Sequence, residues 1–167
     1  MDVSHLELTH RESILVATPP AALWAMLSDV TRTGDWSPTC TACWWDDDVD
    51  VSDGPPVGAW FTGRNEVPER TWETRSQVVA AEPGREFAWQ VGGSLVRWGY
   101  LLAPGPEDGT GAGTELTETW EFLSDGLAYF ATAFGDDAVA QVEDRTRQAH
   151  AGIPRTLAAI KAISEAR

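Results

Sequence analysis

The chain has 167 residues, of which 43% are hydrophobic and 23% are charged, and these proportions are typical of one soluble globular domain. Its formal net charge is −14, with 12 Lys and Arg residues against 26 Asp and Glu residues, so we expect no binding to nucleic acid or to an anionic membrane surface. No apolar run reaches the ~18 residues of a membrane span, and no basic segment typical of a signal peptide opens the chain, so we expect a single domain over residues 1–167 in the cytoplasm.

The N-terminal part predicts a strand followed by two short helices. β-Branched and apolar residues predict the strand over about Leu6–Ala17. We expect Thr18 to cap a helix at Pro20–Leu27, because prolines fit the first helical turn, where an N–H group has no partner. Asp29 is expected to end this helix, and a second helical turn is expected within Val30–Asp35.

The rest of the chain alternates apolar segments with Gly- or Pro-rich turns, which favours strands. The expected strands are Thr39–Asp46, Ala59–Glu66, Thr71–Ala81, Glu86–Val91, Leu95–Ala103 and Thr114–Leu123. The Gly-rich run Pro104–Gly113 is expected to be a flexible hairpin loop, and Ser124–Asp137 could add a helical lid. Apolar residues at every third or fourth position predict a helix over Ala138–Ala166, capped by Asp136 or Asp137 and kinked at Pro154.

Several short motifs occur in a fixed order along nearly the whole chain. They are Trp24 with Asp29, Trp36-Ser37-Pro38, Gly58-Ala59-Trp60-Phe61, Glu82-Pro83-Gly84-Arg85 with Phe87-Ala88-Trp89, Gly113-Thr114-Glu115-Leu116-Thr117-Glu118, and Arg155-Thr156-Leu157. Their order resembles the START-like (SRPBCC) superfamily, which includes polyketide cyclases and dehydrases, lipid-transport domains and Bet v 1-like proteins. The resemblance implies an α+β helix-grip fold, in which a curved antiparallel sheet of about seven strands wraps around a long C-terminal helix. It also implies an apolar ligand between the sheet and that helix.

Strand alternation then selects residues that would face such a ligand. In the strand at Thr114–Leu123, Glu118 shares a face with Leu116, Trp120 and Phe122, so this apolar face should carry a carboxyl group inward. An inward Glu118 is a candidate general acid or base, or an anchor for a ligand hydroxyl. The alternatives are a structural ion pair between Glu118 and an arginine of a neighbouring strand, or a strand twist that lets the carboxylate reach water.

The neighbouring strand, Leu95–Ala103, is apolar on both faces, so its orientation stays open. With Trp98 and Tyr100 inward, the tyrosine hydroxyl would be a polar group in an apolar pocket. With Arg97 inward, its guanidinium could pair with Glu118. Glu118, Arg97 and Tyr100 are therefore the candidate catalytic residues.

The chain contains nine tryptophans, several times the number expected for its length. Aromatic rings suit flat polycyclic ligands, although large rings can equally fill the core under the helix. The candidate ligand-binding residues are Trp36, Phe61, Asn65, Arg75, Trp89, Trp98, Trp120, Phe122 and Phe134.

Cys40 and Cys43 form a C-x-x-C motif, a spacing found in redox pairs and in zinc sites. We expect two free buried thiols instead, because a separation of three residues places strand side chains on opposite faces, and because the three histidines are scattered along the chain. The acidic run Asp46–Asp53 lacks the EF-hand ligand pattern and is expected to be a solvated turn. No metal or cofactor is expected.

Three functions remain open from the sequence. The first is a carrier or sequestering protein for a hydrophobic, aromatic or polycyclic small molecule. The second is a polyketide cyclase, aromatase or dehydratase that uses the same cavity. The third is an interaction module of the same superfamily, with an exposed Trp44 or Trp45 beside the acidic run. The expected assembly is a monomer or a homodimer.

Overall fold

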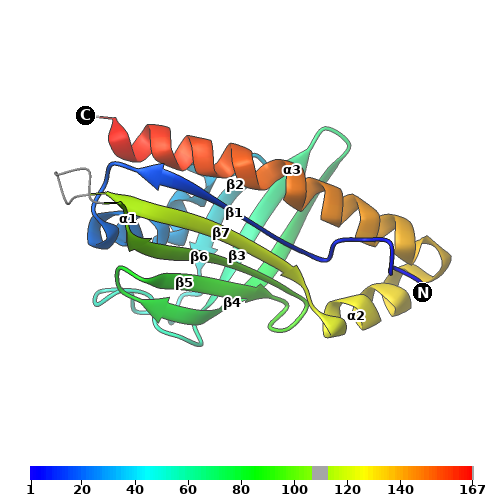
Figure 1. Cartoon of the computed structure of the whole chain (residues 1–167). Helices are drawn as coiled ribbons and strands as arrows, with labels where there is room; N and C mark the ends of the chain where they lie inside the picture. Colours follow the sequence, from blue (N-terminus) through cyan, green and yellow to red (C-terminus); the bar gives the residue numbers. More distant parts are fainter. Residues whose placement is uncertain (107–112, 167) are drawn as a thin grey trace.

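The computed structural model describes residues 1–106 and 113–166, and the central part of the predicted hairpin loop lies outside these ranges. Seven antiparallel strands form one curved sheet in the order β1-β7-β6-β5-β4-β3-β2, and a long C-terminal helix crosses its concave side (Figure 1). This arrangement confirms the α+β helix-grip fold. In chain order the elements are β1 (Thr9–Val16), α1 (Pro20–Leu27), η1 (Val30–Asp35), β2 (Cys40–Trp45), β3 (Trp60–Val67), β4 (Arg70–Glu82), β5 (Glu86–Val91), β6 (Val96–Pro104), β7 (Thr114–Phe122), α2 (Ser124–Phe134), η2 (Gly135–Asp137) and α3 (Ala138–Glu165).

The start of α1 differs from the prediction. Pro19 takes the N-cap position with φ −59° and ψ 146°, and no side chain in the described part of the chain caps the helix. The Thr18 hydroxyl instead donates to the carbonyl oxygen of Ser164 at 3.2 Å, so it ties the end of β1 to the end of α3. Asp29 caps the start of η1, because its carboxylate accepts from the backbone N–H of Thr31 at 3.1 Å.

Helix α3 presents to the sheet the apolar face that its periodicity predicts. Val142, Ile153 and Ile160 are fully buried on this face. The helix continues through Pro154 without interruption. Asp137 lies at the N-cap position as predicted, but its carboxylate accepts from the side-chain amide of Gln141 at 2.8 Å and caps no backbone N–H.

Helix α2 forms the predicted helical segment between the sheet and α3 (Figure 1). Phe130 of α2 packs edge-to-face on Phe122 of β7, with 5.1 Å between ring centroids. Gly126 allows the close approach of α2 to the turn before β6, because a Cβ atom there would overlap the carbonyl oxygen of Leu95. The lid is therefore held by direct backbone contact as well as by aromatic packing.

Over the ranges that the structure describes, none of the helices combines the length and the apolar character needed to cross a membrane.

Candidate functional site

A cavity of about 480 Å³ lies between the concave face of the sheet, helix α3 and the lid helix α2. Its volume falls within the range of about 300–1,000 Å³ that is usual for small-molecule sites. Aromatic side chains from both layers dominate its wall. They are Phe61, Trp72, Phe87, Trp89, Trp98, Tyr100, Trp120, Tyr129, Phe130 and Phe134.

The aromatic residues of the sheet form two connected groups. Trp89 of β5 contacts Phe61, Phe87 and Tyr100, with ring centroids 6.3, 5.8 and 5.7 Å away. Trp98 of β6 lies opposite Trp120 of β7 in the strand register, and their rings are 6.4 Å apart. These rings give the cavity flat apolar surfaces of the kind on which a planar ligand can stack.

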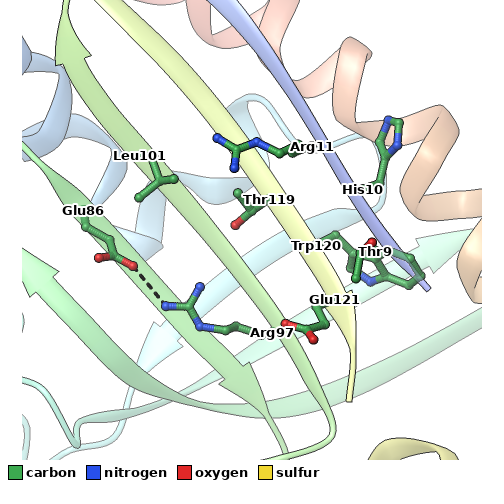
Figure 2. A pocket seen from close by; sticks show the side chains of 9 residues that line it. All are labelled: Thr9, His10, Arg11, Glu86, Arg97, Leu101, Thr119, Trp120 and Glu121. Carbon is green, nitrogen blue, oxygen red and sulfur yellow. Dashed lines mark hydrogen bonds and ion pairs between the residues drawn. The ribbon is translucent and has the colours of Figure 1, made fainter. Parts of the chain in front are cut away.

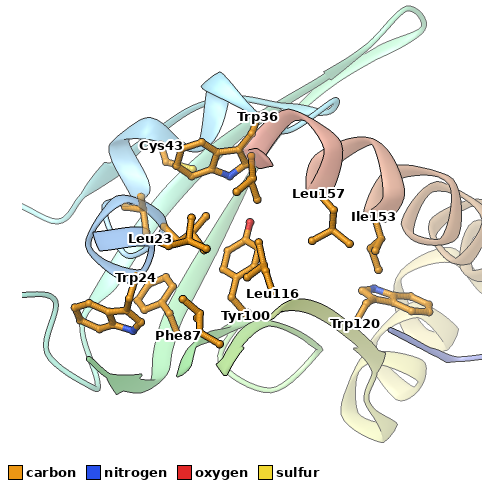
Figure 3. Close-up of a cluster of buried hydrophobic side chains, with 14 of the residues drawn as sticks. Leu23, Trp24, Trp36, Cys43, Phe87, Tyr100, Leu116, Trp120, Ile153 and Leu157 are labelled. Carbon is orange, nitrogen blue, oxygen red and sulfur yellow. The ribbon is translucent and has the colours of Figure 1, made fainter. Parts of the chain in front are cut away.

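Two polar groups lie together within this apolar wall. Tyr100 of β6 and Glu118 of β7 are direct cross-strand partners, and both line the cavity. Glu118 is only 4% exposed, and its Oε2 atom has no hydrogen-bond partner in the described part of the chain. Figure 3 shows the hydroxyl of Tyr100 pointing away from the sheet toward Trp36. The indole N–H of Trp36 is likewise buried and lacks a partner among the described residues.

Burial controls the protonation of this pair. Desolvation raises the pKa of Glu118 well above its usual range, and the carboxylate of Glu12 on the adjacent strand acts in the same direction. Desolvation also raises the pKa of Tyr100, and the neighbouring Glu118 adds to this effect. Both groups therefore hold their protons near neutral pH and can donate hydrogen bonds into the cavity.

Arg97 does not reach this site. Because Trp98 and Tyr100 face inward, strand alternation places Arg97 on the convex face of the sheet, where its Nη2 atom donates to Glu86 Oε1 at 3.0 Å (Figure 2). There it lines a second, open hollow of about 470 Å³ together with Arg11 and Glu121. The possible ion pair between Arg97 and Glu118 is not formed, and no cation among the described residues pairs with Glu118.

The structure places the other predicted ligand-binding residues in three groups. The first group lines the cavity and comprises Phe61, Asn65, Trp89, Trp98, Trp120 and Phe134. Trp36 and Phe122 form a second group, because they are buried in the hydrophobic core and are not among the lining residues. Arg75 lies at the cavity edge, but its guanidinium donates two hydrogen bonds to the Asp46 carboxylate, at 2.7 and 2.8 Å.

The two cysteines lie side by side and not on opposite faces of their strand. Both line the cavity, and their Sγ atoms are 3.2 Å apart, so the expectation of opposite faces is wrong. The reason is a β-bulge between Cys40 and Ala42. Cys40 pairs with Asn65 and Cys43 pairs with Gly63, so three steps along β2 match only two steps along β3. The C-x-x-C spacing was the available signal, but nothing in the sequence located the bulge.

Arg145 of α3 is a further polar residue of the cavity that strand alternation could not identify, because it lies on a helix. Its guanidinium lies 5.5 Å from the ring of Trp72 and 5.8 Å from the ring of Phe130. The only ion pair that the structure records for it joins Nη1 to Asp144 Oδ2 at 2.9 Å. Burial and the nearby Arg70 lower the pKa of Arg145 below its usual value, although its Asp144 partner opposes this effect. The group is therefore a partly desolvated cation beside aromatic rings at the cavity wall.

Residues 8–157 match the model of the family described as polyketide cyclase / dehydrase and lipid transport. The chain belongs to this family. A solution structure of the polyketide-cyclase-like protein Cgl2372 from Corynebacterium glutamicum is 50% identical, covers 95% of this chain and 91% of its own, and superposes with a TM-score of 0.65.

More distant solved structures share the fold. The di-domain ARO/CYC StfQ of the steffimycin biosynthetic pathway is 17% identical, with a TM-score of 0.64, and covers 97% of this chain and 52% of its own length. This chain therefore corresponds to about half of that di-domain protein. Protein NE0264 from Nitrosomonas europaea is 14% identical, with a TM-score of 0.64, and covers 98% of this chain and 96% of its own. No curated protein matches the sequence.

Proposed function

We propose that this protein binds a hydrophobic, aromatic or polycyclic small molecule in the cavity and carries or sequesters it. The observation that carries the proposal is the set of aromatic rings on two layers around a cavity of about 480 Å³. Trp89 and Trp98 supply ring surfaces from the sheet, and Phe130 supplies one from the lid. Planar aromatic ligands gain both apolar burial and ring stacking in such a site.

The polar groups of the cavity wall indicate which functional groups the ligand carries. Glu118 and Tyr100 are protonated donors at the sheet, so they favour a ligand with a hydroxyl or carbonyl oxygen at its inner end. Arg145 favours a carboxylate or another oxygen acceptor at the end near α2 and α3, because a charged hydrogen bond stabilises best where water is partly excluded. The favoured ligand is thus an oxygenated aromatic compound with an acidic end.

A cyclase, aromatase or dehydratase activity on a polyketide-like substrate is the second candidate function. One observation favours it: Glu118 is a buried, protonated carboxyl group with Tyr100 beside it in the cavity. Such a carboxylic acid can protonate a carbonyl oxygen, or a hydroxyl group that leaves as water, and thereby act as a general acid. The family description and the fold shared with ARO/CYC proteins are compatible with this chemistry.

The test is a titration of the intrinsic tryptophan fluorescence with aminoanthracene, a fatty acid and a sterol, with each ligand recovered and weighed by mass spectrometry. Wild type and Glu118→Gln are compared throughout. Saturable quenching with an unchanged ligand mass is the result expected for a carrier. A product formed by wild type and absent with Glu118→Gln would establish the enzyme instead. If none of the three ligand classes quenches the fluorescence, the proposed ligand site is contradicted.

A further inference from the structure

The two thiols of the C-x-x-C motif share one position in the cavity wall. The Sγ atoms of Cys40 and Cys43 lie 3.2 Å apart, which is hydrogen-bond distance for two thiols. Both cysteines are reduced, Cys43 is buried, and Cys40 is partly accessible. A site built from two thiols has chemistry that neither thiol has alone, because one sulfur can attack the other after it has reacted.

A glycine allows the close backbone packing at the bulge that brings the two sulfurs together. Gly63 lies opposite Cys43 on β3, and a Cβ atom there would sit 3.4 Å from Cys43 Sγ and 3.6 Å from Cys40 Sγ. Gly34 of η1 packs beneath the bulge, because a side chain at this position would overlap the carbonyl oxygen of Thr41. Gly34 thus allows the close packing at the bulge, whereas a Cβ at Gly63 would meet both sulfurs at ordinary van der Waals distances.

The hydrogen bonding makes the two thiols different. The Cys40 thiol can donate to Cys43 Sγ or to the carbonyl oxygen of Ala42, which lies 3.5 Å from Cys40 Sγ. Its hydrogen bond to Cys43 lowers the pKa of the Cys43 thiol below its usual value, and the Thr33 hydroxyl acts in the same direction. The pKa of Cys40 is raised, first by its hydrogen bond to Cys43 and then by burial. Cys43 is therefore the thiol that ionises first, and Cys40 is the thiol that follows.

We propose that Cys40 and Cys43 are a redox-active dithiol in the cavity wall, which small organic disulfides convert to an intramolecular disulfide. The thiolate of Cys43 attacks one sulfur of the organic disulfide and forms a mixed disulfide, while the first half of the reagent leaves as a thiolate. Cys40 then loses its proton to solvent and attacks Cys43 Sγ, which releases the second half of the reagent. The protein loses two protons and two electrons, and the organic disulfide is reduced to two thiols.

The geometry favours the second step over the survival of the mixed disulfide. The sulfurs need to approach from 3.2 Å to the bond length of about 2.05 Å. This movement is small, because the two sulfurs are already neighbours and neither side chain has to rotate toward a distant thiol. Formation of this disulfide involves the two thiols alone and does not depend on the ligand that the cavity binds.

The test treats the folded protein with dithiodipyridine, a neutral aromatic disulfide, and measures both the released chromophore and the intact mass. We expect two equivalents of the released thione for each chain and a protein mass that is lower by two hydrogen atoms, with no pyridyl group attached. Two independent thiols would release the same amount of chromophore but would retain two pyridyl groups. That result, or no reaction until the protein is unfolded in urea, would overturn the proposal.

Single variants test the order of the two steps. Cys40→Ser should react at nearly the wild-type initial rate and keep one pyridyl group on Cys43, because the resolving thiol is gone. Cys43→Ser should react more slowly than Cys40→Ser, because burial still raises the pKa of the remaining Cys40 thiol and the Thr33 hydroxyl no longer stabilises the attacking thiolate. Circular dichroism of both variants controls for folding. A faster reaction of Cys43→Ser than of Cys40→Ser would contradict the assigned order.

Discussion

Tyr100 and Glu118 face each other across β6 and β7, and both side chains lie on the cavity side of the sheet. Their neighbours on this face, Trp98 and Trp120, are aromatic, so the pair is an isolated polar spot on an apolar surface. Burial keeps the proton on each group. The pair therefore acts as two hydrogen-bond donors and not as an ion pair. This affects how the stability of the protein changes with pH and which ligands it binds.

The first prediction concerns the pH dependence of stability. Glu118 has a pKa that folding raises above the unfolded value of about 4.3. Its contribution to stability is therefore complete below pH ~4.3 and is lost as the pH rises toward and through the folded pKa, at up to about 1.4 kcal/mol per pH unit. The Glu118→Gln variant lacks this loss.

We expect the free energy of unfolding of Glu118→Gln to match wild type near pH 4 and to exceed it increasingly as the pH rises, by up to about 4 kcal/mol at pH 7. Urea unfolding of both proteins across this pH interval measures the difference at each pH. Because the two chains share all other titrating groups, their contributions largely cancel. A difference that does not change with pH would show that Glu118 titrates normally in the folded protein.

The second prediction concerns the hydroxyl of Tyr100. Replacement by phenylalanine keeps the ring contact with Trp89 and removes one hydrogen-bonding group from the cavity. We expect Tyr100→Phe to bind naphthol about 5–10-fold more weakly, because one hydrogen bond contributes about 1 kcal/mol. Binding of methylnaphthalene, which offers no hydroxyl, should stay within about twofold of wild type. Equal losses for both compounds would indicate a change in cavity shape, and the role of the hydroxyl would be rejected.

The third prediction concerns the charge of Arg145. We expect wild type to bind naphthoate more tightly than its uncharged methyl ester, and Arg145→Gln to lose about 10–150-fold in affinity for naphthoate alone, since a charge-assisted hydrogen bond contributes about 1.5–3 kcal/mol. Arg147→Gln is the matched control, because Arg147 also pairs with Asp144, at 2.9 Å, but is 70% exposed and outside the cavity lining. If both variants lose the same affinity, the effect is long-range charge and Arg145 has no specific role.

The fourth prediction compares two glycines in helices. Gly126→Ala should destabilise the protein by several kcal/mol or displace the lid helix α2, because its Cβ would overlap the Leu95 carbonyl. Gly152→Ala in α3 should be neutral or stabilising by up to about 1 kcal/mol, because alanine favours the helix and the nearest atom to its Cβ, Pro38 Cγ, is at an ordinary 3.6 Å. Thermal unfolding measures both effects. Similar stability of the two variants would contradict a tight contact at Gly126.

Most of the fold was predictable, because the local patterns agree with the tertiary structure. The strand β5 spans Glu86–Val91 as predicted, and the inward apolar face of β7 carries Glu118 with it. The buried face of α3 was predicted from the regular spacing of its apolar residues. In each case, a periodic arrangement of apolar residues corresponds directly to the buried side of one element.

The errors arose where geometry departs from a regular period or depends on a second element. Strand 96–104 is apolar on both faces, and only its packing against the cavity decides that Tyr100 points inward and Arg97 outward. Arg145 lies on a helix face that looks solvent-exposed in sequence until the lid helix and the ring of Trp72 approach it.

The bulge in β2 also affects how this chain should be compared with its relatives. Along β3 the partners of the two cysteines are Asn65 and Gly63, which are two positions apart. A relative with an unbulged strand would place two thiols on the same face with a C-x-C spacing, one residue shorter than the motif of this chain. An alignment with such a relative therefore needs a one-residue gap between Cys40 and Ala42. Without that gap, the residue equivalent to Cys40 is missed, even though the neighbouring strands align without a gap.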